Sequence, residues 1–513
     1  VVLFLTMTSF VTPLIFLLNI GMAIVFNLGS NVFLGEISYI TQALAAVLQL
    51  AVTMDYSIFL LESYEANKER YEGDKKRAMA HAISNTFTSI TASSITTVAG
   101  FVALCFMTFK LGTNIGIVMS KGVVIGVLTC VTVLPAMILT CDKAIEKTTH
   151  RSLIPSLDKL SHGIVKGRYV ALLLFLIVLV PAIHGNNNYK IYYNIDQSLP
   201  KNIPSNEANE KLKKEFNMSN MHMILLKDGL SAKEKSAMSK EIEKVDGVKW
   251  VIGLNSLVGS NVPESMIPND IKKMLKTDNY ELEFVSSDYS SATDEVNSQL
   301  AKIDKIVKKY QNDGMVIGEA PMMKDLQDVT DVDLKTVNNI SILAIFVIIL
   351  ITFKSISIPV ILISVIEFAI ACNMAVPFYT NTSLPFVASI VIGTIQLGAT
   401  VDYAILMTSR YHKERTERGQ SKKDAIRIAH ETSIKSILTS GLCFFAATFG
   451  VSVYSQVDMI GSICTLLSRG AIISMIVVIC VLPAMLWIFD GVIKRTSWNM
   501  IKANVAKRDA EKK

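Results

Sequence analysis

Long apolar runs separated by short polar loops fill most of the chain. Because a helix needs about 20 mostly apolar residues to cross the bilayer core, each of these runs predicts a membrane span. We expect ten spans, after a short apolar stub at residues 1–8. They cover residues 11–30, 39–61, 90–108, 115–140, 169–184, 337–353, 358–378, 384–408, 436–456 and 466–489. The pattern predicts an α-helical polytopic membrane protein.

One long polar segment, residues 188–335, lies between the fifth and sixth spans, and its periodicity differs. Alternating apolar and polar positions predict strands there, and apolar positions three and four apart predict helices. The expected order is strand His222–Lys227, helix Ser231–Val245, strand Lys249–Leu254, strand Glu281–Ser286, helix Ala292–Tyr310 and strand Met315–Gly318. This βαββαβ order is typical of a ferredoxin-like α/β domain. A further helix, Met322–Val337, is expected to continue into the next span.

The chain contains two copies of one pattern, and such internal repetition is informative about architecture. Gln49–Tyr56 has the sequence QLAVTMDY, and Gln396–Tyr403 has the sequence QLGATVDY, at an offset of 347 residues. The same offset relates the pairs Tyr64/Tyr411, Ser89/Ser436 and Ser93/Ser440. Each half encloses an even number of spans, so both halves cross the membrane in the same direction. This predicts a pseudo-twofold axis along the membrane normal, as in transporters built from parallel repeats.

The repeat and the polar segment together predict six regions. They are first-repeat helices from the end of a second span to a sixth (1–141), a cytoplasmic linker (142–168), a seventh helix (169–187), an extracytoplasmic porter domain (188–335), the remaining helices of the second repeat (336–490) and a basic cytoplasmic tail (491–513). The first copy lacks a counterpart of the leading span and the polar domain of the second. We therefore expect roughly 180 residues to precede residue 1.

Composition supports the membrane assignment. Hydrophobic residues make up 51% and charged residues 18% of the chain, and its mean hydropathy is +0.42, whereas soluble domains carry about 25% charged residues. Residues 188–335 have 20 Lys against 24 Asp and Glu, whereas the rest has 30 basic and 20 acidic residues. Because loops rich in Lys and Arg stay in the cytoplasm, residues 188–335 are expected outside. The basic balance therefore needs no nucleic-acid partner.

Motifs of enzymes and metal sites are not found in the sequence. All seven Cys lie in or beside apolar runs, where a thiol is usually a small packing group. No Cys or His spacing is typical of a metal site, and no Walker loop, kinase motif set or Ser-His-Asp arrangement occurs. We expect a protein that is not an enzyme, with no metal ion and no cofactor.

Asp55 and Asp402 lie inside apolar helices, at matching positions of the two copies. A charged residue at the centre of a membrane helix costs about 2.5–3.5 kcal/mol on insertion scales, and such residues usually mark ion or proton pathways. No Lys or Arg lies near either carboxyl in its own helix, so burial favours the neutral form. Two carboxyls close together would titrate as a coupled pair. The alternative is a permanently protonated carboxyl that only links helices, and the duplication favours proton binding.

The neighbours of the two carboxyls are candidates for a supporting role. Tyr56 and Tyr403 follow the two Asp residues and are expected to hydrogen-bond the opposite carboxyl across the axis, unless they only pack there. Two pairs of serines, each sharing a helix face, are candidate donors to the carboxylates: Ser89 with Ser93, and Ser436 with Ser440. The alternative for these hydroxyls is a bond to the carbonyl one turn earlier in their own helix.

Other polar residues near the spans are weaker candidates. Glu367 lies mid-span and is a candidate accessory protonation site or substrate contact. Lys121 and Arg469 occupy matching positions near the outer ends of their spans, where we expect their side chains to extend to the interface. His430 falls in a basic amphipathic stretch, which is typical of a solvated interfacial helix.

The chain resembles the MmpL branch of the resistance-nodulation-division superfamily of transporters. The segment TMDYSIFLLESYEANKERYEG, with Asp55, is similar to the fourth-helix motif of that branch, and IGTIQLGATVDYAILMTSRYHKERTERG, with Asp402, is similar to its tenth-helix motif. Two VLPAM segments fit the ends of its sixth and twelfth helices. The resemblance implies a twelve-helix, proton-driven exporter of lipids or other hydrophobic molecules, with two ferredoxin-like outer domains. It assigns the proton relay to both Asp-Tyr pairs, Asp55 with Tyr56 and Asp402 with Tyr403.

Two features depart from the family pattern or from the repeat. Glu62-Ser63 stands where the second copy has Ser409-Arg410. Residues 188–335 leave little room for the docking subdomain of tripartite pumps, so we expect no outer-membrane channel partner and a plasma-membrane location.

The sequence therefore leads to a hypothesis of proton antiport. Protons would enter from outside, load the two carboxyls and leave to the cytoplasm, while membrane lipids or a hydrophobic substrate move outward. The alternatives are an envelope assembly factor or a lipid-sensing membrane protein on the same scaffold, and sodium coupling in place of protons. A homo-oligomer is left open.

Overall fold

The computed structural model describes residues 2–71, 74–150, 157–193, 203–216, 220–254, 268–498 and 500. The chain forms two compact units. The first, here called the membrane unit, comprises Val1–Ile191, Asp333–Ser455 and Met459–Lys513, and the second, here called the polar unit, comprises Tyr192–Val332 and Gln456–Asp458. Ten helices of the described residues are long and apolar enough to cross a membrane, and each expected span has a counterpart among them.

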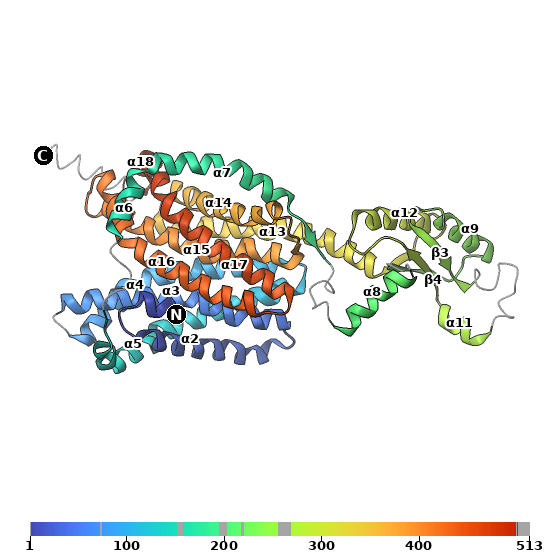
Figure 1. The fold of residues 1–513 in the computed structure, drawn as a ribbon, viewed down its shortest axis with the longest axis horizontal. Coiled ribbons are helices and arrows are strands. Elements are labelled where there is room, and N and C mark those ends of the chain that lie inside the picture. The colour runs from blue at the N-terminus through green and yellow to red at the C-terminus, as the bar shows by residue number, and fades with distance from the viewer. Residues whose placement is uncertain are drawn as a thin grey trace. The chain divides into compact units, whose positions relative to one another are not determined.

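The helices of the membrane unit follow the repeat (Figure 1). The first copy contains α1 (Val2–Thr6), α2 (Thr12–Gly29), α3 (Tyr39–Arg70), α4 (Lys75–Ala103) and α5 (Lys110–Lys147), with short 3₁₀ turns at Ser30–Leu34 and Leu104–Phe106. The connecting helices are α6 (Asp158–Lys166) and α7 (Arg168–Asn188). The second copy contains α13 (Glu319–Phe353), α14 (Ser357–Tyr379), α15 (Phe386–Thr416), α16 (Lys422–Tyr454), α17 (Asp458–Cys480) and α18 (Leu482–Thr496). Strand β1 (Ile191–Tyr192) pairs with β6 (Leu384–Pro385).

Local sequence sets the starts of the central helices. Ser38 precedes α3 and accepts a hydrogen bond from the Ile40 amide, and Asp74 precedes α4 and accepts one from the Arg77 amide. Ser421 does the same for α16, accepting from the Asp424 amide. Side-chain oxygens at these positions satisfy amides that have no partner within the helix. Asp74 and Ser421 lie before the apolar runs, so α4 and α16 begin before the expected spans. Helix α3 begins at Tyr39 as expected and extends beyond its span at the other end, to Arg70.

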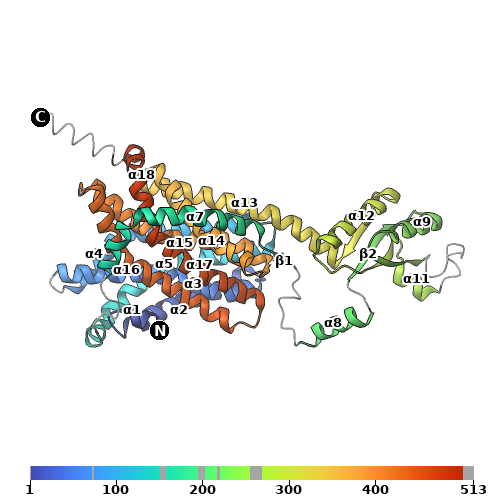
Figure 2. The ribbon, with the colours of Figure 1, turned by 45° about the horizontal axis from the view of Figure 1, so that its top comes forward.

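Each of the four central helices packs against a helix of the other copy. Helix α4 of the first copy packs against α15 of the second, and α16 of the second packs against α3 of the first. At the α4–α15 crossing, a Cβ added to Gly100 would lie 3.2 Å from Gly398 Cα. Small residues permit such close approach of two helices in a membrane. Helices α7 and α14 pack together and lie side by side in both views (Figures 1 and 2).

The last span differs from the prediction of one helix over 466–489. Helix α17 begins at Asp458 and ends at Cys480, and α18 begins at Leu482. Pro483 lies in the first turn of α18, where its missing amide hydrogen costs nothing. In the first copy, Pro135 lies inside the continuous helix α5, so proline alone does not decide where the helix is interrupted.

The polar unit is built on a four-stranded antiparallel sheet of order β3-β4-β2-β5. Its elements are β2 (Asn220–Lys227), α9 (Ala232–Ile242), β3 (Val248–Ile252), β4 (Tyr280–Ser287), α12 (Asp294–Tyr310) and β5 (Met315–Gly318). Helices α8 (Pro204–Phe216) and α11 (Asn269–Leu275) are additional. Every expected strand and helix has a counterpart in the expected order. The ferredoxin-like label itself stays a prediction.

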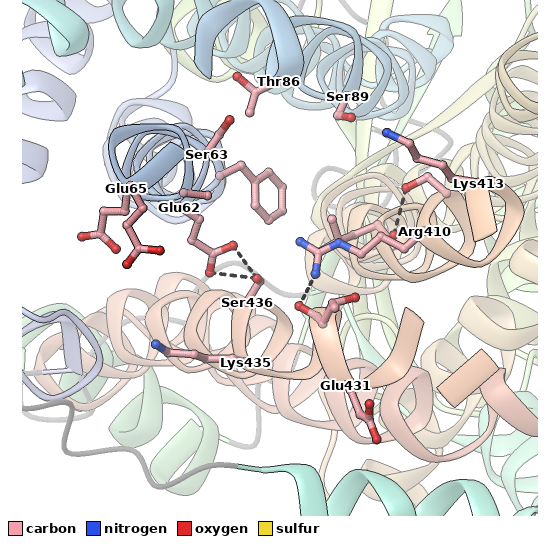
Figure 3. A pocket seen from close by; sticks show the side chains of 16 residues that line it. Glu62, Ser63, Glu65, Thr86, Ser89, Arg410, Lys413, Glu431, Lys435 and Ser436 are labelled. Carbon is pink, nitrogen blue, oxygen red and sulfur yellow. Dashed lines mark hydrogen bonds between the residues drawn. The ribbon is translucent and has the colours of Figure 1, made fainter. Parts of the chain in front are cut away.

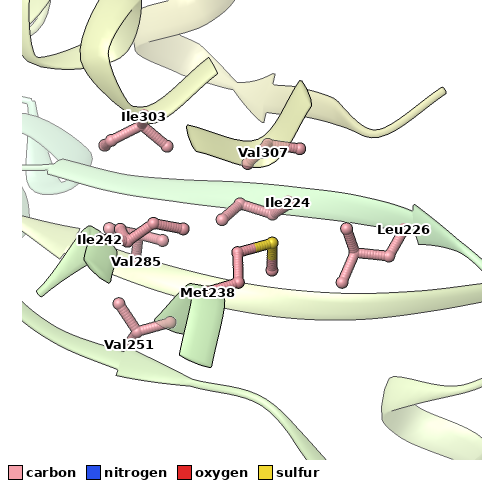
Figure 4. Packing of buried hydrophobic residues seen from close by; sticks show 8 residues of the cluster. All are labelled: Ile224, Leu226, Met238, Ile242, Val251, Val285, Ile303 and Val307. Atoms are coloured by element: carbon pink, nitrogen blue, oxygen red, sulfur yellow. The ribbon is translucent and has the colours of Figure 1, made fainter. Parts of the chain in front are cut away.

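One apolar core joins the sheet to its two helices (Figure 4). Ile224 and Leu226 alternate along β2, so both face the same side of the sheet. Ile303 and Val307 lie one turn apart on α12, and Met238 on α9 completes the contact with the strands. The alternation of the strand and the four-residue spacing of the helix therefore meet in one core, as the sequence pattern predicted.

A charged cluster is buried beside this core. Lys235 of α9 is 3% exposed and pairs with Glu281 of β4, which is 1% exposed. Glu283 of β4 accepts a hydrogen bond of 3.1 Å from Ser239 of α9. Burial raises the pKa of Glu283 to about 7, the neighbouring Glu281 also raises it, and Ser239 and Lys235 oppose the shift.

Candidate functional site

The two carboxyls singled out by the repeat lie deep in the central helices. Asp55 on α3 is 2% exposed and Asp402 on α15 is 3% exposed. Each faces a helix of the other copy, because α15 packs on α4 and α3 packs on α16. The site is thus shared between the copies, and neither copy would complete it alone.

Asp402 is surrounded by hydroxyl groups of α4. Thr96 Oγ1 lies 3.3 Å from Asp402 Oδ1, and Thr97 Oγ1 lies 3.3 Å from Oδ2. Both hydroxyls have shorter contacts to carbonyl oxygens, 2.6 Å from Thr96 to Ser93 and 3.0 Å from Thr97 to Gly398. A hydroxyl has one proton and two acceptor lone pairs, so the shorter bonds take the protons. The free lone pairs can then accept a hydrogen bond from a protonated Asp402.

The surroundings of Asp55 contain fewer donors. The Ser440 hydroxyl of α16 lies near this carboxyl, but within the described residues neither Asp55 Oδ1 nor Ser440 Oγ has a hydrogen-bond partner. At the offset of 347 residues, Cys443 and Phe444 of α16 occupy the places of Thr96 and Thr97. The backbone repeat is therefore preserved, but only Asp402 has a pair of threonine hydroxyls at these two positions.

The two tyrosines do not make the expected bonds to the opposite carboxyl. Tyr56 and Tyr403 are fully buried beside the Asp residues. In the part of the chain that the structure describes, neither phenol oxygen has a hydrogen-bond partner. Of the two alternatives, the described structure therefore favours packing, because the sequence alone does not set the direction of a side chain across a helix interface.

The four serines have different environments. Ser436 Oγ lies 2.8 Å and 2.7 Å from the two carboxylate oxygens of Glu62. Ser89 is exposed, whereas Ser93 is buried and, among the described residues, its hydroxyl has no partner. None of the serines makes a hydrogen bond of ordinary length to Asp55 or Asp402 within the described residues. Sequence reasoning missed Thr96 and Thr97, although they lie three and four residues after Ser93 and so share its helix face.

Two cavities open among the central helices. The larger, of about 720 Å³, extends between α3, α4, α15 and α16 at the ends that carry the basic loops (Figure 3). The smaller, of about 320 Å³, reaches Asp402 and Ser93. They share five lining residues, Phe59, Ser89, Leu406, Ser409 and Lys413. Asp402 therefore borders a cavity, whereas Asp55 lines neither of the two.

The larger cavity contains charges of both signs. Its charged lining residues are Glu62, Glu65, Glu69, Arg410, Lys413, Glu431 and Lys435. Glu62 points to Ser436 and the Arg410 guanidinium points to the backbone oxygen of Thr432 (Figure 3). Because the two copies differ at these positions, the acidic Glu62 of the first copy and the basic Arg410 of the second line the same cavity.

A second pair of polar groups is preserved in both copies. Asn27 Nδ2 donates to Gln49 Oε1 at 2.9 Å, and Asn373 Nδ2 donates to Gln396 Oε1 at 2.8 Å. Lys121 Nζ donates to the Asn27 backbone oxygen at 3.0 Å. The Arg469 guanidinium donates to Asn373 in the same way, at 2.7 Å and 2.8 Å. Lys121 also donates to Asn31 at 2.6 Å, in the turn that follows α2. The expectation that the two cations extend to the interface stays a prediction.

The two remaining candidates, His430 and Glu367, lie away from the carboxyl pair. His430 is fully buried, and its ring bonds Ser161 of α6 at 2.7 Å and the Ile479 backbone oxygen at 3.0 Å, so the expectation of a solvated surface is wrong. Glu367 on α14 is partly buried, and its Oε1 has no hydrogen-bond partner in the described residues. Within the part of the chain that the structure describes, no hydrogen bond joins Glu367 to the Asp-Tyr pairs. In the described ranges no group of three His, Cys, Asp or Glu residues could hold a metal ion.

The sequence of this chain matches a known family over most of its length. Residues 1–154 and 197–509 match the MMPL family. The chain belongs to the MMPL family. It is a multi-pass membrane protein, as the ten candidate spans also indicate.

Three similar proteins carry names that concern transport or membranes. The probable transport protein MmpL12 of Mycobacterium tuberculosis is 24% identical over 280 residues, which cover 52% of this chain and 24% of that protein. The putative membrane protein ActII-3 of Streptomyces coelicolor is 22% identical over 497 residues, or 92% of this chain and 65% of that protein. The siderophore exporter MmpL5 of Mycobacterium tuberculosis is 23% identical over 289 residues, or 52% of this chain and 29% of that protein. The chain thus spans less than two thirds of the length of each relative.

Proposed function

We propose that the protein is a proton-driven exporter, an antiporter that moves a hydrophobic or amphiphilic molecule out of the cell as protons enter. The observation that supports it best is the pair of buried carboxyls, Asp55 and Asp402, at matching positions where the two copies meet. Ionisable residues inside membrane helices generally serve ion or proton pathways. Family membership supports the transport role.

Protonation of these groups can change the packing of the central helices. A carboxylate at this depth needs donors or water around it, whereas a neutral carboxyl can be packed dry. Loading a proton therefore favours close packing of α4 on α15, and releasing it favours an arrangement that admits water to Asp402 through the smaller cavity. One charge falling through 100 mV supplies about 2.3 kcal/mol. Such a two-state element can drive transport if the substrate binds the two arrangements unequally.

The substrate and orientation are further parts of the proposal. The relatives' names include a siderophore exporter, and the family resemblance favours lipids or other hydrophobic molecules. With the basic loops in the cytoplasm, the polar unit would lie outside the plasma membrane and the larger cavity would face the cytoplasm. The proton gradient takes the place of a cofactor, and no outer-membrane channel is proposed as a partner.

The test is proton-coupled efflux by the full-length protein in proteoliposomes, with an encapsulated pH dye and a fluorescent hydrophobic cation as the transported probe. We expect Asp402→Asn to abolish pH-driven efflux. The matched control is Asp158→Asn, a change to an exposed residue of α6, which should leave efflux unchanged. Retained efflux in folded, inserted Asp402→Asn would refute the assignment. Efflux that follows a sodium gradient at fixed pH would replace protons by sodium.

A further inference from the structure

The two buried carboxyls differ in their access to the cavities. Asp402 borders the smaller cavity directly, whereas Asp55 lines neither. A proton on Asp55 therefore needs an intermediate group to reach the larger cavity. Glu62, the residue that breaks the repeat, follows Asp55 on the same helix and lines that cavity.

Glu62 is placed for this task by the helix itself. It follows Asp55 by seven residues, so both side chains lie on the same face of α3, about 10 Å apart along the axis. Helix α16, which packs on this face, presents Ser440 near Asp55 and, one turn away, Ser436 at Glu62. The polar groups therefore follow one another in the order Asp55, Ser440, Ser436 and Glu62, and Glu62 lines the larger cavity.

The contact of Glu62 with Ser436 suits both protonation states. Both carboxylate oxygens are within 2.8 Å of the hydroxyl oxygen. An ionised Glu62 can share the single hydroxyl proton between its oxygens, and a protonated Glu62 can donate to Ser436 through one oxygen and accept through the other. A group that gains and loses protons needs a partner that can hydrogen-bond both its ionised and its protonated form.

Charged side chains of both signs surround Glu62 in the larger cavity. From α15, Arg410 and Lys413 line the same cavity, and Arg410 is electrostatically coupled to Glu62. Helix α16 adds Lys435 and Glu431, α3 adds Glu65 and Glu69, and α4 adds only the uncharged Thr86 and Ser89. A cation across the cavity stabilises a carboxylate. Glu62 therefore lies beside two cations of the other copy, at the wall of a cavity that is wide enough to hold water.

We propose that Glu62 is the proton-release group for Asp55, and this rests on the proposed function. The O–H bond of protonated Asp55 breaks and an O–H bond of Glu62 forms, with the intervening serine hydroxyls and water passing the proton along. Glu62 then gives its proton to water in the larger cavity and returns to the carboxylate. No electrons are transferred. Asp402 needs no such group, and its counterpart of Glu62 is Ser409.

The experiment follows hydrogen–deuterium exchange of the protonated carboxyls in full-length protein by infrared spectroscopy, at acidic pH in lipid. The carbonyl stretching bands are assigned by their loss in Asp55→Asn and Asp402→Asn. In Glu62→Gln, exchange at Asp55 should slow by about 100-fold, the lower end of what positioned proton transfer contributes, and exchange at Asp402 should not change. Glu62→Asp should restore most of the rate, because the carboxylic acid is kept.

A matched control and a second variant make the test decisive. Glu69→Gln removes another carboxylate of the same cavity and helix and should leave exchange at Asp55 unchanged. Ser436→Ala tests the same route without altering Glu62 and should also slow Asp55. Unchanged exchange at Asp55 in both Glu62→Gln and Ser436→Ala would overturn the proposal. This readout does not depend on export, so the inference can fail while Asp402→Asn still abolishes efflux, and the reverse.

Discussion

The two copies of the membrane repeat place the same acid in different surroundings. Asp402 has the hydroxyls of Thr96 and Thr97 at 3.3 Å, whereas Asp55 meets a surface where Cys443 and Phe444 stand in their place. The access to cavities differs in the same way, since Asp402 borders one directly. Duplication preserved the backbone and the carboxyl, and the polar partners diverged. The two acids are therefore expected to have unequal roles.

Removing each acid in turn gives the most direct test of the roles of Asp55 and Asp402. Asp402→Asn and Asp55→Asn should each lower proton-coupled efflux by about 100-fold or more, because neither amide can carry a proton. Proteoliposome efflux measures this, with monodisperse elution as the check of folding. Substantial activity in Asp402→Asn would refute the assignment, and substantial activity in Asp55→Asn alone would mean that Asp402 suffices.

The crossing of α4 and α15 should respond unequally to two alanine substitutions. A Cβ on Gly100 would lie 3.2 Å from backbone atoms of α15, whereas a Cβ on Gly398 would lie 3.5 Å from its nearest neighbour. Gly100→Ala should therefore separate the helices at a cost of about 1–3 kcal/mol and reduce efflux strongly. Gly398→Ala should be tolerated. Thermal inactivation and efflux of both variants test this, and an equal effect would contradict the asymmetry of the crossing.

A smaller effect is expected from the hydroxyl groups that distinguish the two copies. Thr97→Val keeps the shape but leaves Asp402 without one partner, which costs about 1–3 kcal/mol. Efflux should fall roughly tenfold, the change that 1.4 kcal/mol produces. Ser440→Ala should have less effect on the efflux rate, because Ser440 has no hydrogen-bond partner in the described structure and a water molecule can replace its hydroxyl in the route from Asp55 to Glu62. The reverse order of the two rates would show that Asp55 depends on its hydroxyl more than Asp402 does.

The smallest effect on efflux is expected from a buried carboxyl outside the membrane. Burial raises the pKa of Glu283 to about 7 from an ordinary value of 4.5. The folded polar unit therefore binds this proton more tightly than the unfolded chain. The resulting stability is fully present below pH 4.5 and is lost as the pH rises through 7.

The measurement for Glu283 is hydrogen exchange of β4 in the full chain, corrected for intrinsic rates. Protection should be greater at pH 5 than at pH 8. Glu283→Gln should reduce this difference in protection. It should leave efflux unchanged, because Glu283 belongs to the polar unit and the two carboxyls belong to the membrane unit. A loss of efflux in Glu283→Gln would show that a buried acid of the polar unit takes part in transport.

Much of the architecture follows from sequence because it rests on periodic patterns. Ten apolar runs lead to ten candidate spans, since the bilayer sets a minimum length for each. The polar segment yields its strands and helices in order because strand and helix periods differ. The repeat locates Asp55 and Asp402, since a carboxyl in an apolar run is conspicuous without any structure.

Tertiary structure decided what surrounds those residues. Nothing in the pattern says that Thr96 and Thr97 would face Asp402, that both tyrosine hydroxyls would find no partner among the described residues, or that Ser436 would bind Glu62. These contacts join segments more than 300 residues apart, and they depend on which face of each helix meets its neighbour. Sequence periodicity determines that a helix has a polar face, whereas helix packing determines which residue that face meets.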